Sequence, residues 1–293
     1  MKKTSVMNLF LIVILTVFVN NSNAQMKIIY PNVNEIGKKS FGYAVLKLAL
    51  DSSGEDFDLN VSRTRVNNAR IRKMIHQKII SIADFGTGAE FEQELLPIYF
   101  PIDLGLNGWR IFLIHKDKQS EFAKIKTIAG LKKMTAGQGN LWSDVKILEN
   151  AGLKVYQVSS LTSLFRMTEK KRFDYFPLGA NEVHSLLDQF QENCPNVIVE
   201  HNLLLIYPFG RLFFVHKDNR KLHDAVYSGL IKAFENGSLW KVFKSHASNK
   251  AIFTKANLKH RKQIFIKNPH MTTAFKKIPK KFFFQLNMLD ENR

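Results

Sequence analysis

Two short polar stretches of the sequence combine groups that can hydrogen-bond a small molecule. The first runs from Asp84 to Gly88 (DFGTG), and the second from Gly137 to Asn140 (GQGN). Carboxylate, hydroxyl and amide side chains supply donors and acceptors, and backbone amides at the start of a helix add further donors. Both stretches therefore favour reversible binding of a small polar ligand.

Motifs for chemical catalysis are not found beside these stretches. Gly137-x-Gly139 lacks the third glycine of a dinucleotide fingerprint, because Trp142 stands in its place. The chain has no Gly-x-Ser-x-Gly, no His-Glu-x-x-His and no P-loop. Its 9 histidines include no close pair at ligand spacing, and its one cysteine, Cys194, has no partner for an internal disulfide. The sequence predicts no enzyme, no cofactor and no metal site.

Alternating strands and helices are predicted to position both stretches. In the stretch from Met134 to Glu182 the pattern predicts a strand into the Gly-rich turn, a helix that ends at Gly152, a strand at 155–158, a second helix, and a strand at 173–176. The opening, with predicted strands at 27–30, 58–62 and 79–83, follows the same order. Such units give parallel strands with right-handed crossovers, and ligands bind beyond the carboxyl ends of those strands.

Two similar runs suggest how the halves are connected. Residues 109–117 read WRIFLIHKD and residues 211–218 read RLFFVHKD. We interpret them as strands that cross between two lobes, out and back. Residues 203–207 and 212–216 are predicted to form an antiparallel pair, and residues 222–236 an amphipathic helix.

The two ends of the chain differ in composition from the rest. Residues 1–24 have two lysines, an apolar core of about fourteen residues and a small-x-small site at Ser22-Asn23-Ala24, which predicts a cleaved signal peptide and export. The chain carries a net charge of +18, and from Ala247 onward eleven Lys or Arg stand against two acids, a local charge of about +9. A solvated extension, with a basic helix at 257–267, or adhesion to an anionic envelope surface both fit this charge. The run Phe282–Phe284 is predicted to cover a groove on the body of the protein, or else to lie on a membrane surface.

Three segments carry a resemblance to a known family. They are Lys217–His246 (KDNRKLHDAVYSGLIKAFENGSLWKVFKSH), GLKKMTAGQGNLWSDVKIL at 130–148, and FRMTEKKRFDYFPLG at 165–179. In this order the chain from about Lys27 to Ser245 resembles the type 2 periplasmic binding proteins, especially the family 3 solute-binding proteins of ABC importers. The resemblance implies an α/β fold of two lobes, each a mainly parallel sheet flanked by helices, joined by two hinge strands. The implied division is residues 25–113 and 210–246 for lobe one, 114–209 for lobe two, and 247–293 for a basic extension.

This sequence departs from the family where amino-acid-binding members hold their ligand. They carry an Arg shortly after the third strand, and here residues 86–92 (GTGAEFE) contain none. They also carry an Asp after the strand that follows Phe-Asp, where this chain has Glu182 at a different offset. The resemblance therefore leaves an α-amino-acid ligand in doubt.

Eleven residues are candidates for ligand binding because they fall at predicted strand ends or near the crossings. They are Asp84, Phe85, Thr87, Gly88, Arg110, Gln138, Gly139, Asn140, Trp142, Gly179 and Glu182. Structural roles also fit several of them: capping for Asp84 and Asn140, core packing for Phe85 and Trp142, a solvated acid for Glu182, and an interlobe salt bridge for Arg110.

Two functions follow as expectations. The first is an exported, periplasmic solute-binding protein, a monomer that captures a small polar ligand for an ABC permease or a membrane sensor. The second is an adaptor of the same fold whose basic tail binds a partner or an anionic surface. Export makes nucleic acid a poor partner for either.

Overall fold

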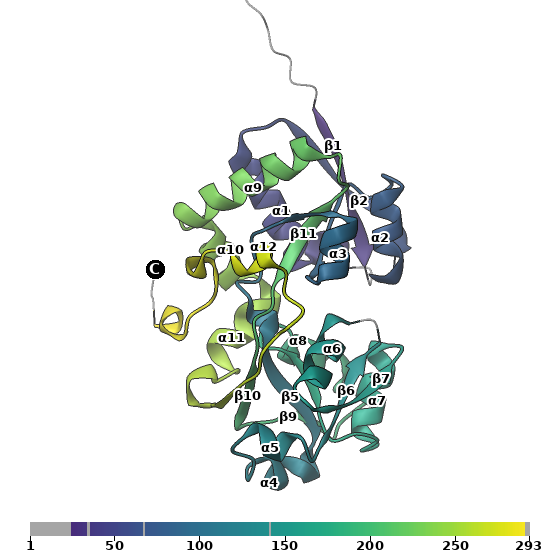
Figure 1. Ribbon diagram of the computed structural model, residues 1–293, viewed down its shortest axis with the longest axis vertical. Coiled ribbons are helices and arrows are strands. Elements are labelled where there is room, and N and C mark those ends of the chain that lie inside the picture. The colour runs from purple at the N-terminus through teal and green to yellow at the C-terminus, as the bar shows by residue number, and fades with distance from the viewer. Residues whose placement is uncertain (1–24, 34–35, 67, 141, 291–293) are drawn as a thin grey trace, which may run out of the picture.

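The chain folds into two lobes that lie one above the other in a computed structural model (Figure 1). The structure describes residues 25–33, 36–66, 68–140 and 142–290, so the predicted signal peptide lies outside the described residues. Within these residues no helix is both long and apolar enough to cross a membrane.

The first lobe is built around five strands, which form a two-stranded and a three-stranded sheet side by side. Its strands are β1 (Met26–Val33), β2 (Phe57–Val66), β3 (Ile82–Gly86), β4 (Leu96–Ile98) and β11 (Arg211–Val215). Strand β1 pairs in parallel with β2, and β11 runs antiparallel between β3 and β4. Ser81 N donates to Ile29 O (2.9 Å) and so places β3 beside β1. The spatial order is therefore β2-β1-β3-β11-β4, with the two-stranded and the three-stranded sheet meeting between β1 and β3.

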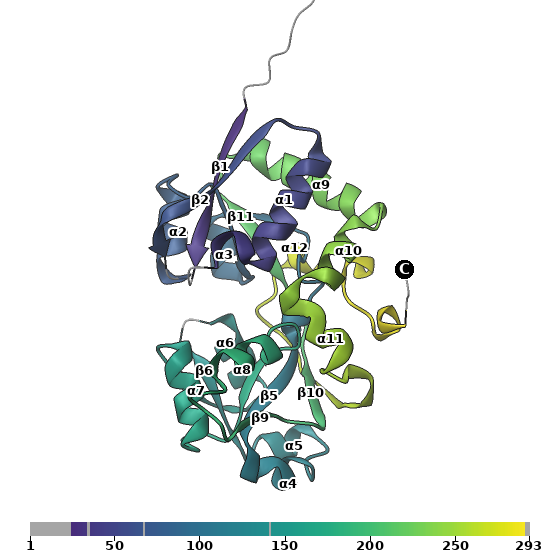
Figure 2. The same ribbon diagram turned by 180° about the vertical axis from the view of Figure 1, so that it is seen from behind.

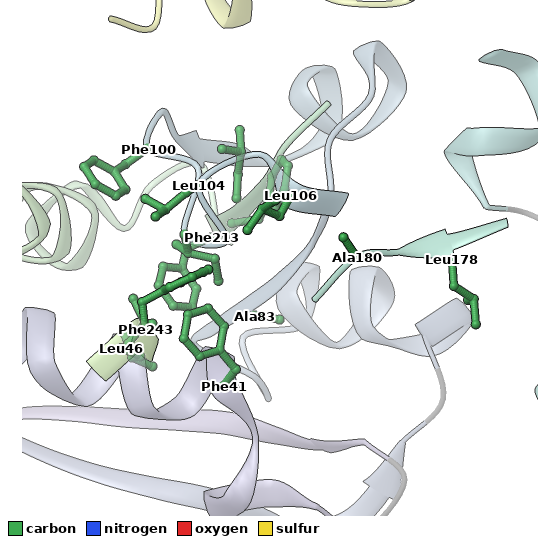
Figure 3. Close-up of a cluster of buried hydrophobic side chains, with 14 of the residues drawn as sticks. Phe41, Leu46, Ala83, Phe100, Leu104, Leu106, Leu178, Ala180, Phe213 and Phe243 are labelled. Carbon is green, nitrogen blue, oxygen red and sulfur yellow. The ribbon is translucent and has the colours of Figure 1, made fainter. Parts of the chain in front are cut away.

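Helices cover the faces of this sheet. They are α1 (Phe41–Ser53), α2 (Asn68–His76), α3 (Ala89–Glu94), α9 (Arg220–Glu235) and α10 (Ser238–Ser245). Helix α1 begins at Ser40, whose hydroxyl caps Tyr43 N, and ends at Gly54 in a left-handed conformation. Helices α1 and α9 pack so closely that a Cβ on Gly229 would lie 1.8 Å from the Ala49 carbonyl oxygen, and only glycine allows this contact. Figure 3 shows Phe41, Leu46 and Phe213 packed together inside the first lobe.

The second lobe repeats the arrangement with a longer sheet. Its strands are β5 (Trp109–His115), β6 (Thr135–Gly139), β7 (Lys154–Val158), β8 (Phe176–Gly179), β9 (Val197–Val199), β10 (Leu203–Ile206) and β12 (Lys262–Phe265). Its helices are α4 (Gln119–Phe122), α5 (Ile128–Leu131), α6 (Ser143–Asn150), α7 (Leu161–Glu169), α8 (Val183–Phe190) and α11 (Lys250–Thr254). Gly137 N donates to Tyr175 O (2.7 Å), which joins the β6-β7 pair to β8 and so to β5, β10 and β12.

Several predicted elements are confirmed and several are corrected. Helices α1 and α9 and strand β7 lie where the periodicity predicts them. The predicted strands at 79–83 and 173–176 lie about three residues further along the chain, as β3 and β8. The predicted antiparallel pair of 203–207 with 212–216 is wrong: β10 pairs with β5 and β12 in the second lobe, and β11 pairs with β3 and β4 in the first. The turn at Pro208–Gly210 is therefore a passage between lobes and not a hairpin.

The two similar strands β5 and β11 each begin where the chain enters a lobe. Strand β5 starts after the passage that leads out of the first lobe, and β11 starts after the return passage (Figures 1 and 2). The sequence His-Lys-Asp stands at the end of each strand, at 115–117 and 216–218. In each, the histidine Nδ1 accepts a hydrogen bond from the aspartate amide two residues later, at 3.3 Å for His115 and 3.2 Å for His216. The repeat is thus a shared strand ending in each lobe.

The basic extension is folded onto the body of the protein. The predicted helix at 257–267 is wrong: this segment holds a single 3-10 turn, Leu258–His260, followed by β12. The prediction for Phe282–Phe284 is confirmed, because Phe282 and Phe284 are buried and Phe283 is partly buried. A short helix, α12 (Thr273–Lys276), precedes this run and lies against the first lobe (Figure 1).

Candidate binding cleft between the lobes

A cavity of about 340 Å³ lies between α3 of the first lobe and α6 of the second. The first lobe contributes Arg72 and residues 87–92 to its wall, and the second contributes Trp142, Lys146 and Glu149 from one side of α6. The lobes come close at one point, since a Cβ on Gly88 would lie 3.6 Å from Ser143 Oγ. Three predicted residues, Thr87, Gly88 and Trp142, belong to this wall.

Glu92 is the central polar group of the first-lobe wall. Its carboxylate accepts hydrogen bonds from the hydroxyls of Thr87, Tyr99 (2.8 Å) and Thr272 (2.5 Å). Burial, followed by the neighbouring Glu92 charge, raises the pKa of Tyr99, so its phenol remains a donor. Glu92 thus stands in the stretch that lacks the family's arginine, with hydroxyl partners in place of a cation.

The other charged groups of the wall are more exposed. Arg72 Nη1 lies 2.9 Å from Glu90 Oε1 and 3.4 Å from Glu94 Oε2, and its guanidinium stands 4.8 Å from the centre of the Phe91 ring. Lys146 and Glu149 are exposed. Phe91 and Trp142 also line the cavity, so the site has three carboxylates, two cations and two aromatic residues.

Asp84, Arg110 and Glu182 belong to a buried polar network outside this wall. Asp84 accepts a hydrogen bond from the Tyr30 hydroxyl and forms an ion pair with the guanidinium of Arg211. Arg110, which is 2% exposed, donates to Asp144, and the Tyr207 hydroxyl donates to the same carboxylate.

Neighbouring charges hold both arginines of this network in the protonated state. Burial by itself lowers the pKa of Arg110, but Asp144, Tyr207 and Glu182 outweigh it and raise that pKa above its usual value. Burial also lowers the pKa of Arg211, but Asp84 and weaker neighbouring charges together outweigh it and raise that pKa. The predicted alternative of an interlobe salt bridge for Arg110 is wrong, because Asp144 lies on α6 of the same lobe.

The remaining predicted residues occupy structural positions. Phe85 stacks on Phe214 with ring centres 4.3 Å apart, and Gly179 N donates to Glu182 Oε1 (3.0 Å). Gly139 lies against Trp142, whose ring atoms would be 2.5 Å from an added Cβ. Asn140 is exposed, and its backbone amide donates to Val158 O (2.9 Å).

Gln138 differs from the others. Its side chain is 0% exposed, and neither its amide nitrogen nor its oxygen has a hydrogen-bond partner among the described residues.

Residues from the C-terminal extension complete the wall, and no sequence pattern indicated them directly. Asn268, His270 and Met271 line the cavity although they lie far along the chain from residues 87–92. The nearest signal was the run Phe282–Phe284, which indicates that the extension folds back but not where. Within the part of the chain that the structure describes, no three His, Cys, Asp or Glu side chains form a group that could hold a metal ion.

A second cavity of about 330 Å³ is mainly aromatic and aliphatic. Trp109, Tyr207, Phe209, Phe265 and Phe283 are among its lining residues, and no carboxylate or cationic side chain lines it. The cavity at α3 and α6 is therefore the better candidate for a polar ligand.

Comparison with solved structures identifies the fold as that of the substrate-binding proteins. An ancestral arginine-binding protein bound to arginine matches with a TM-score of 0.56 at 14% identity, covering 76% of this chain and 99% of that one. A periplasmic binding protein of Salmonella typhimurium described as having high arginine specificity matches at 0.53 and 12% identity, over 75% and 99% of the two chains. A histidine kinase sensor domain with similarity to periplasmic binding proteins matches at 0.55 and 7% identity, over 76% and 96%.

No protein-family model matches the sequence, and the search of curated proteins found no match. The likeness to the solved structures thus lies in the two-lobed fold. Because these neighbours are matched over nearly their whole length, about a quarter of this chain lies outside the shared fold.

Proposed function

We propose that this protein is an exported binding protein that closes its two lobes on a small polar solute. The observation that carries the proposal is the cavity of about 340 Å³ with polar and aromatic groups from both lobes, in a fold shared with substrate-binding proteins. Ligand sites of this size are concave, lie between lobes and combine apolar walls with a few polar groups. Hinge closure around the solute is the motion that such a fold allows.

The charges of the wall favour a solute with a positive group, because the arginines are paired and the lysine of the wall, Lys146, is exposed. Arg72 is paired with Glu90 and Glu94, and in the buried network Arg110 is paired with Asp144 and Arg211 with Asp84. These arginines are already neutralised, whereas Glu92 is held only by hydroxyls. A cationic group of the solute would find a carboxylate here, and the aromatic rings of Phe91 and Trp142 add cation–π attraction.

Delivery to an importer and presentation to a sensor both fit the fold. The solved neighbours include the substrate-binding protein of an amino acid ABC transporter and a histidine kinase sensor domain. The first is described as substrate-binding and the second as a sensor, and we propose binding without catalysis for this chain too. The alternative of an adaptor with a free basic tail has no support from these neighbours, and here the extension packs on the body of the protein.

Thermal unfolding in the presence of cationic metabolites tests the proposal. Agmatine and L-arginine form a useful pair, because they share the guanidinium and differ in the α-carboxylate. A solute at about 100 times its Kd stabilises the folded state by about 2.7 kcal/mol, and we expect agmatine to stabilise at least as well as L-arginine.

The cavity variant Trp142→Ala should abolish the shift, while Tyr156→Ala, at a residue 50% exposed and outside the cavity, should retain it. A flat response to all polar solutes would count against a solute-binding function. A response retained in Trp142→Ala would place the solute elsewhere.

A further inference from the structure

One segment of the extension, Ile266–Thr272, passes from the second lobe back to the first beside the cleft. We call this segment the strap. It is the stretch between β12 and α12, and it lies beside the hinge in both views (Figures 1 and 2). The chain passes between the lobes before β5, before β11 and between α10 and α11, so the strap is a fourth connection.

The second-lobe end of the strap is firmly anchored. Strand β12 adds to the sheet edge by pairing in parallel with β10, from Leu203↔Lys262 to Ile206↔Phe265. Just before it, the guanidinium of Arg261 is buried and donates to the carbonyls of Ala256 (2.7 Å) and Leu203 (3.1 Å). This end moves with the second lobe.

The first-lobe end is anchored by aromatic packing and one backbone bond. Phe282 lies edge-on to Phe234 of α9 with ring centres 4.9 Å apart, and 4.7 Å from Phe100. Phe284 N donates to Leu104 O (2.8 Å), and Phe275 is 2% exposed. This end moves with the first lobe.

Between the two anchors, the strap contacts the hinge and both sides of the cleft. Asn268 Nδ2 donates to Pro208 O (2.9 Å) in the return passage. His270 Nε2 lies 2.7 Å from Asn150 Nδ2 at the end of α6. Thr272 Oγ1 donates to Glu92 Oε2 (2.5 Å) on the first-lobe wall.

We propose that the strap is part of the binding site: it supplies His270 and Met271 to the wall, and its Thr272–Glu92 bond holds the lobes at their spacing. We call the Thr272–Glu92 bond the latch. The identity of the solute rests on the proposed function, but the role of the latch does not. A segment fixed to both lobes limits their relative motion, so opening and closing must bend the strap or break the Thr272–Glu92 bond. His270 and Met271 then select among solutes, since both residues line the space that a solute fills.

Thiol labelling tests the latch without a ligand. Ser143→Cys places a reporter where the second lobe lies close to Gly88 of the first, and the native Cys194 is 1% exposed and serves as the unreactive background. Thr272 also caps α12 by accepting from Phe275 N (3.0 Å), so the informative change is Thr272→Asp, which keeps a capping oxygen but sets a negative charge against Glu92.

We expect the reporter in Thr272→Asp to react about tenfold faster, the factor that accompanies loss of one charge-assisted hydrogen bond. The exposed neighbour Thr273 provides the matched control, Thr273→Asp, which should leave the rate unchanged. Thr272→Ser, which keeps the hydroxyl, should restore the original rate. Equal rates in Thr272→Asp and Thr273→Asp would overturn the latch.

Titration calorimetry with agmatine and L-arginine tests the wall. His270→Ala should weaken whichever of the two binds by about fivefold or more, the loss of one modest polar contact. His260→Ala, an exposed histidine of the same extension outside the cavity, should not. Equal affinity in the two variants would overturn the role of the strap in the wall. If neither compound binds the wild-type protein, the proposed function loses its support, and the labelling rates still decide the latch.

Discussion

Two groups of charged side chains near the hinge differ in how deeply they are buried and in how they are paired. In the buried network, Arg110 and Asp84 have nearly no exposed side-chain surface and each faces an opposite charge, Asp144 and Arg211 respectively. In the cleft, Glu90, Lys146 and Glu149 are exposed, and Glu92 is held by hydroxyls alone. The charges of the first group are paired with each other, whereas those of the second group can still bind a charged solute.

The difference shows why charge alone does not identify a binding residue. A buried charge must be paired, because an unpaired one loses its hydration without compensation. A buried charge that is fully paired within the protein therefore forms few further interactions with a solute. Charges at a cleft remain hydrated until a solute displaces the water, so their partial pairing is the feature that binding uses.

The largest expected effect comes from breaking the buried network. Asp144→Ala removes the carboxylate that Arg110 and Tyr207 share and leaves the guanidinium buried without its main partner. We expect the free energy of unfolding to fall by about 3–5 kcal/mol, measured by urea denaturation.

The surface pair Lys78–Asp218 provides the control. Asp218 has 74% side-chain exposure and lies 3.5 Å from Lys78, so Asp218→Ala should change stability by about 0.5 kcal/mol or less. A similar loss in both variants would remove the distinction between the two groups.

An intermediate effect is expected at Glu92. Glu92→Gln keeps the shape but replaces one acceptor oxygen with a donor, which opposes the hydroxyl donors around it. We expect a loss of about 1–2 kcal/mol in stability together with weaker binding of agmatine, because the charge that would attract a cation is gone. Glu94→Gln, on the same helix but outside the cavity, should spare binding. Unchanged agmatine affinity in Glu92→Gln would contradict the role of this carboxylate.

The smallest expected effect is a pH dependence at a further partly buried group, His184 of α8. Burial, followed by the charges of Arg261 and Lys255, lowers the pKa of His184 from 6.5 to about 4. The unfolded state therefore binds a proton more readily than the folded state between these values. Stability is complete above pH 6.5 and is lost as the pH falls toward 4.

We expect His184→Gln to remove about 1 kcal/mol of this acid sensitivity, a value reduced for the partial exposure of the ring. The measurement is the free energy of unfolding of both proteins at a series of pH values. Parallel curves for wild type and variant would show that another group titrates.

Local pattern was sufficient for the fold class and for many elements. The spacing of apolar residues predicts helices α1 and α9. The short apolar run after the glycine that ends a helix predicts strand β7. The pairing of β10 and β11 could not be predicted in this way, because two adjacent apolar runs look the same whether they form a hairpin or enter separate sheets.

The residues of the candidate site likewise fall into those that local sequence pattern predicts and those that it does not. Thr87, Gly88 and Trp142 lie in the cavity because strand ends and helix starts meet at the carboxyl edge of a sheet, which the sequence predicts. Asp84 and Arg110 have equally suitable chemistry, but their partners Arg211 and Asp144 come from distant strands and helices. No local pattern distinguishes a carboxylate that is available to a ligand from one that is already in an ion pair with an arginine.

The amino-acid sequence alone determined two lobes of repeated strand and helix units, a polar edge on each, and an extension with an aromatic end. The tertiary structure alone decided which charges are paired internally, and that the strap brings His270 and Met271 to the wall of the cleft. The physical reason is range: periodicity and turn chemistry act over a few residues, whereas the pairing of buried charges and the path of the extension depend on contacts between segments far apart in the chain.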